Sequence, residues 1–181
     1  MNKKKIIIYQ VFTRLFGNTN TACLCGGSIT ENGCGKMSDF TVGALREIKK
    51  LGITHIWYTG IIEHATQTDY TAYGIAPDHP AIVKGKAGSP YAIKDYYDVD
   101  PDLANDVPKR MKEFENLVSR THRNGLKMII DFVPNHVSRQ YRSDAHPAGI
   151  VDLGGEGRRE QGIQPTQQFL LYFTDRTSGL F

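Results

Sequence analysis

The chain has 181 residues, which is enough for one ordinary domain with a hydrophobic core. Its 40% hydrophobic and 23% charged residues are the usage of a folded globular protein and exclude the disordered class. The net charge of +3 comes mostly from scattered lysines and arginines. The short basic runs Lys3–Lys5 and Arg158–Arg159 are not interleaved with aromatic residues, so we expect no nucleic-acid partner.

The sequence predicts neither a secretion signal nor a membrane partner. The apolar run Ile6–Ile8 is too short for the core of a signal peptide, and no small-residue cleavage site follows it. No window approaches the ~18 apolar residues of a membrane span. Cys23, Cys25 and Cys34 are odd in number and share one glycine-rich loop, which fits reduced thiols in a cytoplasm better than a disulfide framework or a zinc site.

The chain begins with a predicted strand, a long loop and a helix. The run from Ile6 to Phe12 is β-branched and aromatic, which is typical of a strand buried on both faces. A loop without periodicity follows from about Phe16 to Met37. Ser38 or Asp39 can then cap a helix. The apolar face of that helix is Phe40, Ala44, Leu45 and Ile48, and Gly52 ends it.

A second strand, a second helix and a third strand follow in order. The second strand is Ile53–Tyr58, and the roughly fifty residues after it form a connection long enough to suggest a functional loop. Asp106 is the predicted cap of the second helix, Pro108 lies in its first turn and Gly125 ends it. Leu126–Val133 is the third strand. The apolar positions of this helix are Val107, Met111, Phe114 and Val118.

Strands and helices therefore alternate, which predicts two right-handed βαβ units and a parallel sheet. After His136 the chain turns polar and glycine-rich, and only Phe169–Phe173 resembles a strand beyond that point. Two helices cannot cover both faces of such a sheet, and an eight-stranded barrel needs ~250 residues. We therefore expect the first part of a larger fold. A doubly wound nucleotide-binding domain is disfavoured because no glycine-rich phosphate loop follows the first strand.

Polar residues follow the third predicted strand, where parallel α/β folds bind ligands. Asn135 offers a carbonyl oxygen suited to calcium, and His136 offers a donor to a hydroxyl. Asp131 can accept hydrogen bonds from the backbone or from a neighbouring side chain. The alternative is a turn closed by side-chain hydrogen bonds.

The long second loop holds two further polar stretches, Asp69–His79 and Ser89–Pro101. An aromatic ring beside carboxylates and amides suits a sugar, which presents apolar faces flanked by hydroxyls. On residue types alone, tyrosines such as Tyr91, Tyr96 and Tyr97 more often pack in a core or a loop than form a platform for a ligand.

Three stretches, FTVGALREIKKLGITHIWYTGII, SPYAIKDYYDVDPDLA and GLKMIIDFVPNHVS, resemble the N-terminal third of an alpha-amylase superfamily enzyme, glycoside hydrolase family 13. The resemblance covers roughly Ile6 to Ser138, in the same order and with the same intervening helices. Its most specific part is DFVPNH, which fits the family signature Asp-x-x-x-Asn-His.

The resemblance implies roles for five residues. His136 would hydrogen-bond the sugar in the subsite that is cleaved, and Tyr91 would stack on the same sugar. Asp95 would help to fix the loop of Tyr91 in this substrate-binding region. Asp131 would support the site, and Asn135 would be a calcium ligand in members that bind this ion.

The sequence departs from the family pattern at two places near this site. Ser89-Pro90 precedes Tyr91 where a His-Gly pair is common, and Gly60 replaces the proline often found after the second strand.

The resemblance also implies a fold and a division of the chain. Residues 1–136 would form the first three β/α units of a (β/α)8 TIM barrel, an incomplete catalytic domain. Residues 137–181 would begin the excursion (B) domain that is inserted after strand three.

The implied activity is retaining hydrolysis of alpha-glucans or maltooligosaccharides, with two carboxyl groups ~5–5.5 Å apart. In this family the nucleophile, the acid/base and a third aspartate come from the fourth, fifth and seventh strands. All three would lie beyond Phe181, so we expect no catalytic residue in this chain and no hydrolysis by the chain alone.

Other functions remain open. A transglycosylase or an isomerase uses the same scaffold, and a non-catalytic carbohydrate-binding or assembly relative keeps the barrel without the carboxylates. An open three-stranded sheet exposes unpaired backbone and apolar surface. We therefore expect the chain to pair with a second copy or with the remainder of the enzyme.

Overall fold

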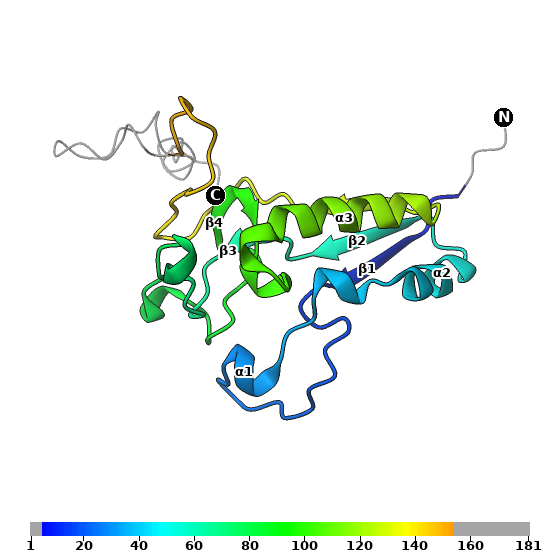
Figure 1. The fold of residues 1–181 in the computed structure, drawn as a ribbon, viewed down its shortest axis with the longest axis horizontal. Coiled ribbons are helices and arrows are strands. Elements are labelled where there is room, and N and C mark those ends of the chain that lie inside the picture. Colours follow the sequence, from blue (N-terminus) through cyan, green and yellow to red (C-terminus); the bar gives the residue numbers. More distant parts are fainter. Residues whose placement is uncertain (1–4, 154–181) are drawn as a thin grey trace, which may run out of the picture.

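The computed structural model of the protein describes residues 5–153 (Figure 1). Its centre is a three-stranded parallel sheet in the order β1-β2-β5, as the alternation of strands and helices predicts. The strands are β1 (Ile8–Phe12), β2 (His55–Thr59) and β5 (Lys127–Ile130). Ile8, His55 and Lys127 lie side by side at the start of the sheet.

Each observed strand is shorter than predicted or shifted along the chain, because hydrogen-bonded pairing with the neighbouring strand, rather than hydrophobicity, determines where a strand begins and ends. The first strand begins at Ile8, and the third ends at Ile130 instead of Val133. The prediction of burial on both faces is wrong for β1. Val11 belongs to the core, whereas Ile8, on the opposite face, is 50% exposed.

Helix α2 (Val42–Lys50) lies between β1 and β2 in the chain. Its cap is Thr41, whose Oγ1 accepts a hydrogen bond from the Ala44 N–H at 3.1 Å, so the predicted cap at Ser38 or Asp39 is wrong. Asp39 instead accepts the Lys36 N–H at 2.7 Å, within a short 3-10 turn. Gly52 follows the helix with φ +82°, as expected for its end.

Helix α3 (Arg110–Arg123) lies between the second loop and β5. The predicted cap at Asp106 is also wrong, because a 3-10 turn over Val107–Lys109 precedes the helix and takes in Pro108. The Asp106 carboxylate accepts a hydrogen bond from Lys109 Nζ instead. Met111 is 40% exposed, so the helix turns its buried face, Leu117 and Thr121, toward the core.

The core lies between the sheet and the two helices and centres on Phe40. The Phe40 ring stacks on Phe16, with centroids 4.2 Å apart, and meets Tyr58 edge-on at 4.8 Å. The Thr121 hydroxyl donates to the Leu117 carbonyl at 2.8 Å. Tyr58 must therefore donate its own hydroxyl proton to Thr121, 2.7 Å away, and this buried hydroxyl is satisfied.

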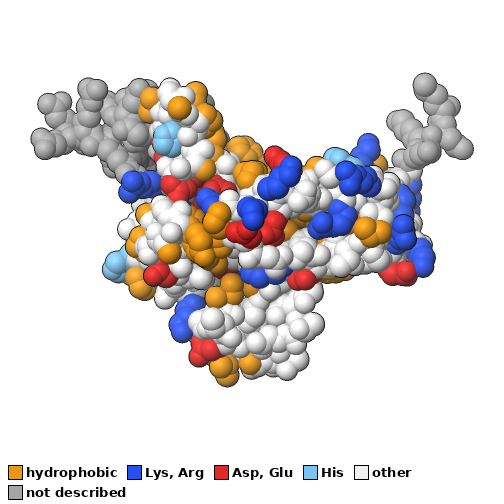
Figure 2. Space-filling view, in the orientation of Figure 1, with side chains coloured by type: hydrophobic (Ala, Val, Ile, Leu, Met, Phe, Trp, Pro, Cys, Tyr) orange, Lys and Arg blue, Asp and Glu red, His pale blue; other side chains and the backbone are white. Residues whose placement is uncertain are grey.

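Both long loops contain structure that the sequence did not indicate. The first contains one helical turn, α1 (Ile29–Asn32), and Figure 2 shows the segment around it as a largely uncharged lobe. The second contains an antiparallel hairpin of β3 (Ile62–His64) and β4 (Ile93–Val99). β3 is too short and too polar for a periodic signal, and 28 residues separate it from its partner β4.

The segment after His136 runs along β4. The Ser138 N–H donates to the Ile93 carbonyl at 2.7 Å, and the Arg142 N–H donates to the Lys94 carbonyl at 3.1 Å. The predicted strand Phe169–Phe173 lies outside the described residues. A domain boundary at residue 136 therefore stays a prediction.

Within residues 5–153, no helix combines the length and the apolar character that a membrane span requires. Cys23, Cys25 and Cys34 are free thiols rather than disulfide partners. Burial, together with the charges of Asp100 and Asp102, raises the pKa of the Cys34 thiol to about 11, so this thiol is a poor nucleophile.

Candidate functional site

Asp131 joins the carboxyl ends of two neighbouring strands. Its Oδ1 accepts a hydrogen bond from Trp57 Nε1 at 2.6 Å, and its Oδ2 accepts one from the Gly60 N–H at 3.2 Å. A side-chain donor and a backbone donor are the two kinds of partner expected for this residue. Asp131 thus ties the chain after β5 to the end of β2.

Gly60 shows why this chain departs from the proline common in the family. Its φ is +81°, a conformation closed to proline, and its N–H donates to Asp131, which a proline could not do. A methyl group at Gly60 would lie 3.1 Å from Pro90 Cβ and from the Phe12 ring. Gly60 therefore lets Pro90 approach the ends of β1 and β2.

Tyr91 follows this contact directly. Ser89 closes the turn: its Oγ accepts the Tyr91 N–H at 3.3 Å, and its carbonyl accepts the Ala92 N–H at 3.0 Å. The Tyr91 side chain is 39% exposed. The Ser89-Pro90 departure thus forms a turn that leaves the Tyr91 ring partly exposed.

Asn135 and His136 are exposed and bind each other. The 2.7 Å contact joins Asn135 Oδ1 to His136 Nδ1, and because an amide oxygen only accepts, Nδ1 carries the proton. Nε2 is the ring nitrogen that remains for a ligand. Tyr96 holds the backbone of this turn by donating its hydroxyl to the Val133 carbonyl at 2.5 Å.

The resemblance implies Asn135 as a calcium ligand. Among the described residues, the one group of three potential carboxylate, imidazole or thiol ligands is Glu63, Asp98 and Asp144, which excludes His136. Calcium also takes backbone carbonyl oxygens, amide oxygens and waters, so this group of three does not decide whether an ion binds at Asn135. Calcium at Asn135 stays a prediction.

Asp95 is fully buried and holds a different segment from the one expected. Its Oδ1 accepts the Tyr97 N–H at 2.7 Å. Its Oδ2 accepts from Ser143 Oγ at 2.8 Å, from the Asp144 N–H at 3.1 Å and from the Ala145 N–H at 3.3 Å. With 0% exposure, Asp95 positions residues 143–145 rather than offering a surface to a sugar.

Sequence reasoning missed a charged cluster of Arg14, His64, Asp100 and Asp102 beneath the loops. Arg14 Nη2 lies 3.1 Å from His64 Nε2 and 3.3 Å from Asp102 Oδ2. Tyr70 donates its hydroxyl to Asp102 Oδ1 at 2.7 Å. No local motif marks this cluster, since Arg14 and Asp102 are 88 positions apart.

The protonation of the charged cluster follows from its donors. Because a guanidinium only donates, His64 Nε2 accepts from Arg14, and the ring is neutral with its proton on Nδ1. Burial and the charge of Arg14 lower the pKa of His64 to about 4. Burial and the charge of Asp102 raise the pKa of Asp100 well above its ordinary value. The cluster is a structural support for the loops that follow β1 and β3.

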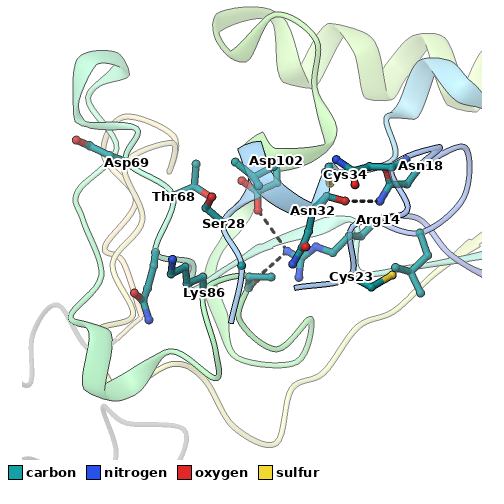
Figure 3. Close-up of a pocket in the computed structure, with 17 residues that line it drawn as sticks. Arg14, Asn18, Cys23, Ser28, Asn32, Cys34, Thr68, Asp69, Lys86 and Asp102 are labelled. Atoms are coloured by element: carbon teal, nitrogen blue, oxygen red, sulfur yellow. Dashed lines mark hydrogen bonds and ion pairs between the residues drawn. The ribbon is translucent and has the colours of Figure 1, made fainter. Parts of the chain in front are cut away.

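A cavity of about 470 Å³ lies beside this cluster, between the first loop and the second (Figure 3). Arg14 and Asp102 of the charged cluster line it, together with Asn18 and Asn32 of the first loop and Lys86 of the second. Tyr91, Asp131, Asn135 and His136 do not line it. The residues that the resemblance assigns to a sugar site therefore lie outside the lining of this cavity.

A family model described as alpha amylase, catalytic domain, matches residues 10–147. The chain belongs to the alpha-amylase family. The matched residues include Tyr91, Asp95, Asp131, Asn135 and His136. The proteins that are similar to this chain include enzymes of glycoside hydrolase family 13.

This alpha-amylase family chain is similar to two curated bacterial enzymes. It is 27% identical over 139 residues to trehalose-6-phosphate hydrolase of Bacillus subtilis, which is 77% of this chain and 18% of that protein. It is 28% identical over 147 residues to cyclomaltodextrin glucanotransferase of Bacillus sp. strain 1-1, which is 76% of this chain and 18% of that enzyme. The chain spans about a fifth of the length of these two relatives.

Two further similarities are of different kinds. A 57-residue stretch is 47% identical to the amino acid transporter heavy chain SLC3A1 of Rattus norvegicus, covering 32% of this chain and 7% of that protein. The crystal structure of an alpha-amylase from Lactobacillus plantarum matches with 28% identity and a TM-score of 0.51, covering 75% of this chain and 24% of that one. The parallel β/α arrangement described above is thus part of the alpha-amylase fold.

Proposed function

We propose that this chain supplies one side of the sugar-binding subsite of an alpha-amylase-type glycosidase that acts on alpha-glucans or maltooligosaccharides with retention. One observation carries the proposal. The Asp131–Gly60 hydrogen bond and the packing of Pro90 at Gly60 bring the stretches around Tyr91 and His136 to one edge of the sheet. These are the two stretches that the family motif places at a sugar.

In this proposal each residue acts through the atoms that the fold leaves available. Tyr91 stacks its exposed ring on the apolar face of the sugar. His136 Nδ1 is held by Asn135, so Nε2 meets a sugar hydroxyl, as an acceptor when neutral and as a donor when protonated. Asp131 fixes the chain after β5 by accepting a hydrogen bond from Trp57, and Asp95 positions residues 143–145.

The proposal also includes the finer fold and the missing chemistry. Residues 1–136 are the first three β/α units of a TIM barrel, and the excursion domain begins at residue 137. The nucleophile, the acid/base and the third aspartate come from later strands of the whole enzyme. The isolated 181-residue chain then binds sugar weakly and hydrolyses nothing. Its free thiols favour a cytoplasmic location.

Three alternatives use the same scaffold, and the relatives support two of them. In a transglycosylase, a second sugar rather than water takes the glycosyl group, and the similarity to a cyclomaltodextrin glucanotransferase favours this alternative. An isomerase would share the first half of the mechanism. A non-catalytic assembly role is favoured by the 57-residue match to a transporter heavy chain.

The test is an intact mass of the natural gene product and an assay of that product for reducing ends released from maltooligosaccharides. We expect a product several times longer than this chain that cleaves them. Tyr91→Ala should lower kcat/KM by about 100-fold, because it removes a group that orients the sugar. The matched control Tyr73→Ala, at a 50% exposed tyrosine of the same loop, should keep it. A 181-residue product without activity, or equal effects of the two variants, would refute the proposal.

Pairing of the isolated chain is a second prediction. Among the described strands, β1 and β5 each pair only with β2, so both outer edges of the sheet carry unpaired backbone groups. We expect the purified 181-residue chain to elute as a dimer or larger species in size-exclusion chromatography with light scattering. A monodisperse monomer that melts cooperatively would contradict this prediction.

A further inference from the structure

Three carboxylates from separate segments meet where residues 143–145 cross the β3–β4 hairpin. Glu63 lies on β3, Asp98 lies on β4, and Asp144 follows the Asn135-His136 turn in the chain. Each contributes one oxygen, and these oxygens all lie within 4.8 Å of one another. Figure 2 shows acidic side chains at the surface where the segment after residue 140 meets this hairpin.

Glu63 is the member of this carboxylate group without adequate compensation. It is 2% exposed, and its Oε2 has no hydrogen-bond partner among the described residues. Its Oε1 lies 3.9 Å from Lys94 Nζ, but that ammonium is closer to Asp78, at 3.1 Å, and also donates to the Ala76 carbonyl. A buried carboxylate in this position is costly unless a further positive group joins it.

The neighbours of Glu63 add negative charge. Asp98 has one partner of opposite charge, Arg110, whose Nε donates to Oδ2 at 2.8 Å. Asp144 is exposed at the end of the group, and Asp95 lies close enough to act on Glu63 electrostatically. Burial, helped by the charges of Asp144, Asp98 and Asp95, raises the pKa of Glu63 to about 9 although the charge of Lys94 lowers it. At neutral pH Glu63 is therefore protonated while no ion is bound, and a bound cation would displace that proton.

We propose that Glu63, Asp98 and Asp144 together bind one hard divalent cation, with calcium as the best fit. All three donors are oxygens, which excludes the thiolate and imidazole sets that zinc prefers. Oxygens that share a calcium ion, each ~2.3–2.6 Å from it, lie at most ~5.2 Å apart, and the three oxygens, all within 4.8 Å of one another, meet this condition. The exposed side of Asp144 leaves room for the waters that complete the coordination.

The hydrogen bonds at Asp95 prepare the group for this role. Asp95 accepts the backbone N–H of Asp144, so the Asp144 carboxylate is already carried to the hairpin before any ion binds. A bound cation would then join β3, β4 and the segment after His136. This site is separate from Asn135, whose amide oxygen faces His136.

Calorimetric titration of the 181-residue chain with Ca²⁺, after removal of metals with a chelator, tests the proposal. We expect one site per chain, weaker binding of Mg²⁺, and a rise in Tm with Ca²⁺. Glu63→Gln keeps the shape of the side chain and should weaken Ca²⁺ binding at least ~10-fold. Glu115→Gln, the same change at an exposed position of α3, should bind as the wild type does. Circular dichroism establishes that each protein is folded.

A second pair of variants keeps the result unambiguous. Asp144→Asn changes an exposed group, so it should fold normally and still lose at least ~10-fold in Ca²⁺ affinity. Asn135→Ala should retain the affinity of the wild type. The proposal is overturned if the wild type takes up no Ca²⁺ at millimolar concentration. It is also overturned if Asn135→Ala abolishes binding while Glu63→Gln and Asp144→Asn keep it.

Discussion

Replacing Arg14 by methionine is expected to lower the free energy of unfolding by about 3 kcal/mol, because the change leaves buried carboxylates without their cation. Arg14 lies 3.3 Å from Asp102 and 3.7 Å from Asp100, two side chains that are 2% and 1% exposed. Removing one partner of a buried ion pair usually costs ~3–5 kcal/mol, and we expect the lower value because Tyr70 still donates a hydrogen bond to Asp102. Denaturant unfolding followed by circular dichroism measures this loss.

The matched control is Arg46→Met, the same change at an exposed arginine of α2, which should alter stability by less than about 0.5 kcal/mol. The double variant Arg14→Met/Asp102→Asn should recover about 1 kcal/mol, since one of the stranded charges is removed with its partner. Equal losses for Arg14→Met and Arg46→Met would contradict a supporting role for the charged cluster.

The Arg14 effect should also depend on pH in a defined direction. Removing the guanidinium raises the pKa of Asp100 further above its value in the unfolded chain. A carboxyl whose pKa is raised by folding contributes stability that is present at low pH and lost as the pH rises. The difference in unfolding free energy between wild type and Arg14→Met should therefore narrow as the pH falls and Asp100 becomes protonated in both proteins.

Replacing Phe40 by alanine should lower the free energy of unfolding by about 4 kcal/mol. Phe40 is 0% exposed, stacks on Phe16 and meets Tyr58 edge-on, so alanine leaves a cavity between the sheet and α3 that backbone movement cannot fill. The m-value from denaturant unfolding should stay constant while the midpoint falls.

Phe132→Ala is the control for this prediction. Phe132 is 68% exposed, and its ring lies 5.5 Å from that of Tyr96. Its removal should cost less than about 1 kcal/mol. A loss at Phe132 as large as that at Phe40 would show that the core is not where the structure has it.

Local patterns in the sequence determined the alternation of strands and helices, the glycines that end α2 and α3, and the Asp-x-x-x-Asn-His motif. These features depend on residues within one turn or one strand of each other. Hydrophobic periodicity reports which side of an element is buried, and a glycine reports a positive φ, without knowledge of distant partners. The parallel sheet followed from the order of elements alone.

The tertiary structure decided everything that depends on a partner far along the chain. Thr41 rather than Ser38 caps α2, because Asp39 and its neighbours form their own turn. Asp95 holds Ser143, 48 positions away, although the motif associates it with the loop of Tyr91. A sequence contains many carboxylates and hydroxyls that are able to form hydrogen bonds with one another, and the packing of the folded chain decides which of these pairs form.

The candidate site divides in the same way. The sequence by itself determined the residue types at the strand ends, Tyr91, Asp131, Asn135 and His136. Only the tertiary structure decided that Gly60 must be a glycine, that Asn135 orients the His136 ring, and that Glu63, Asp98 and Asp144 converge. The reason is physical: a chemical group is written in the sequence, whereas its surroundings, which set its charge and its available atoms, exist only after the chain has folded.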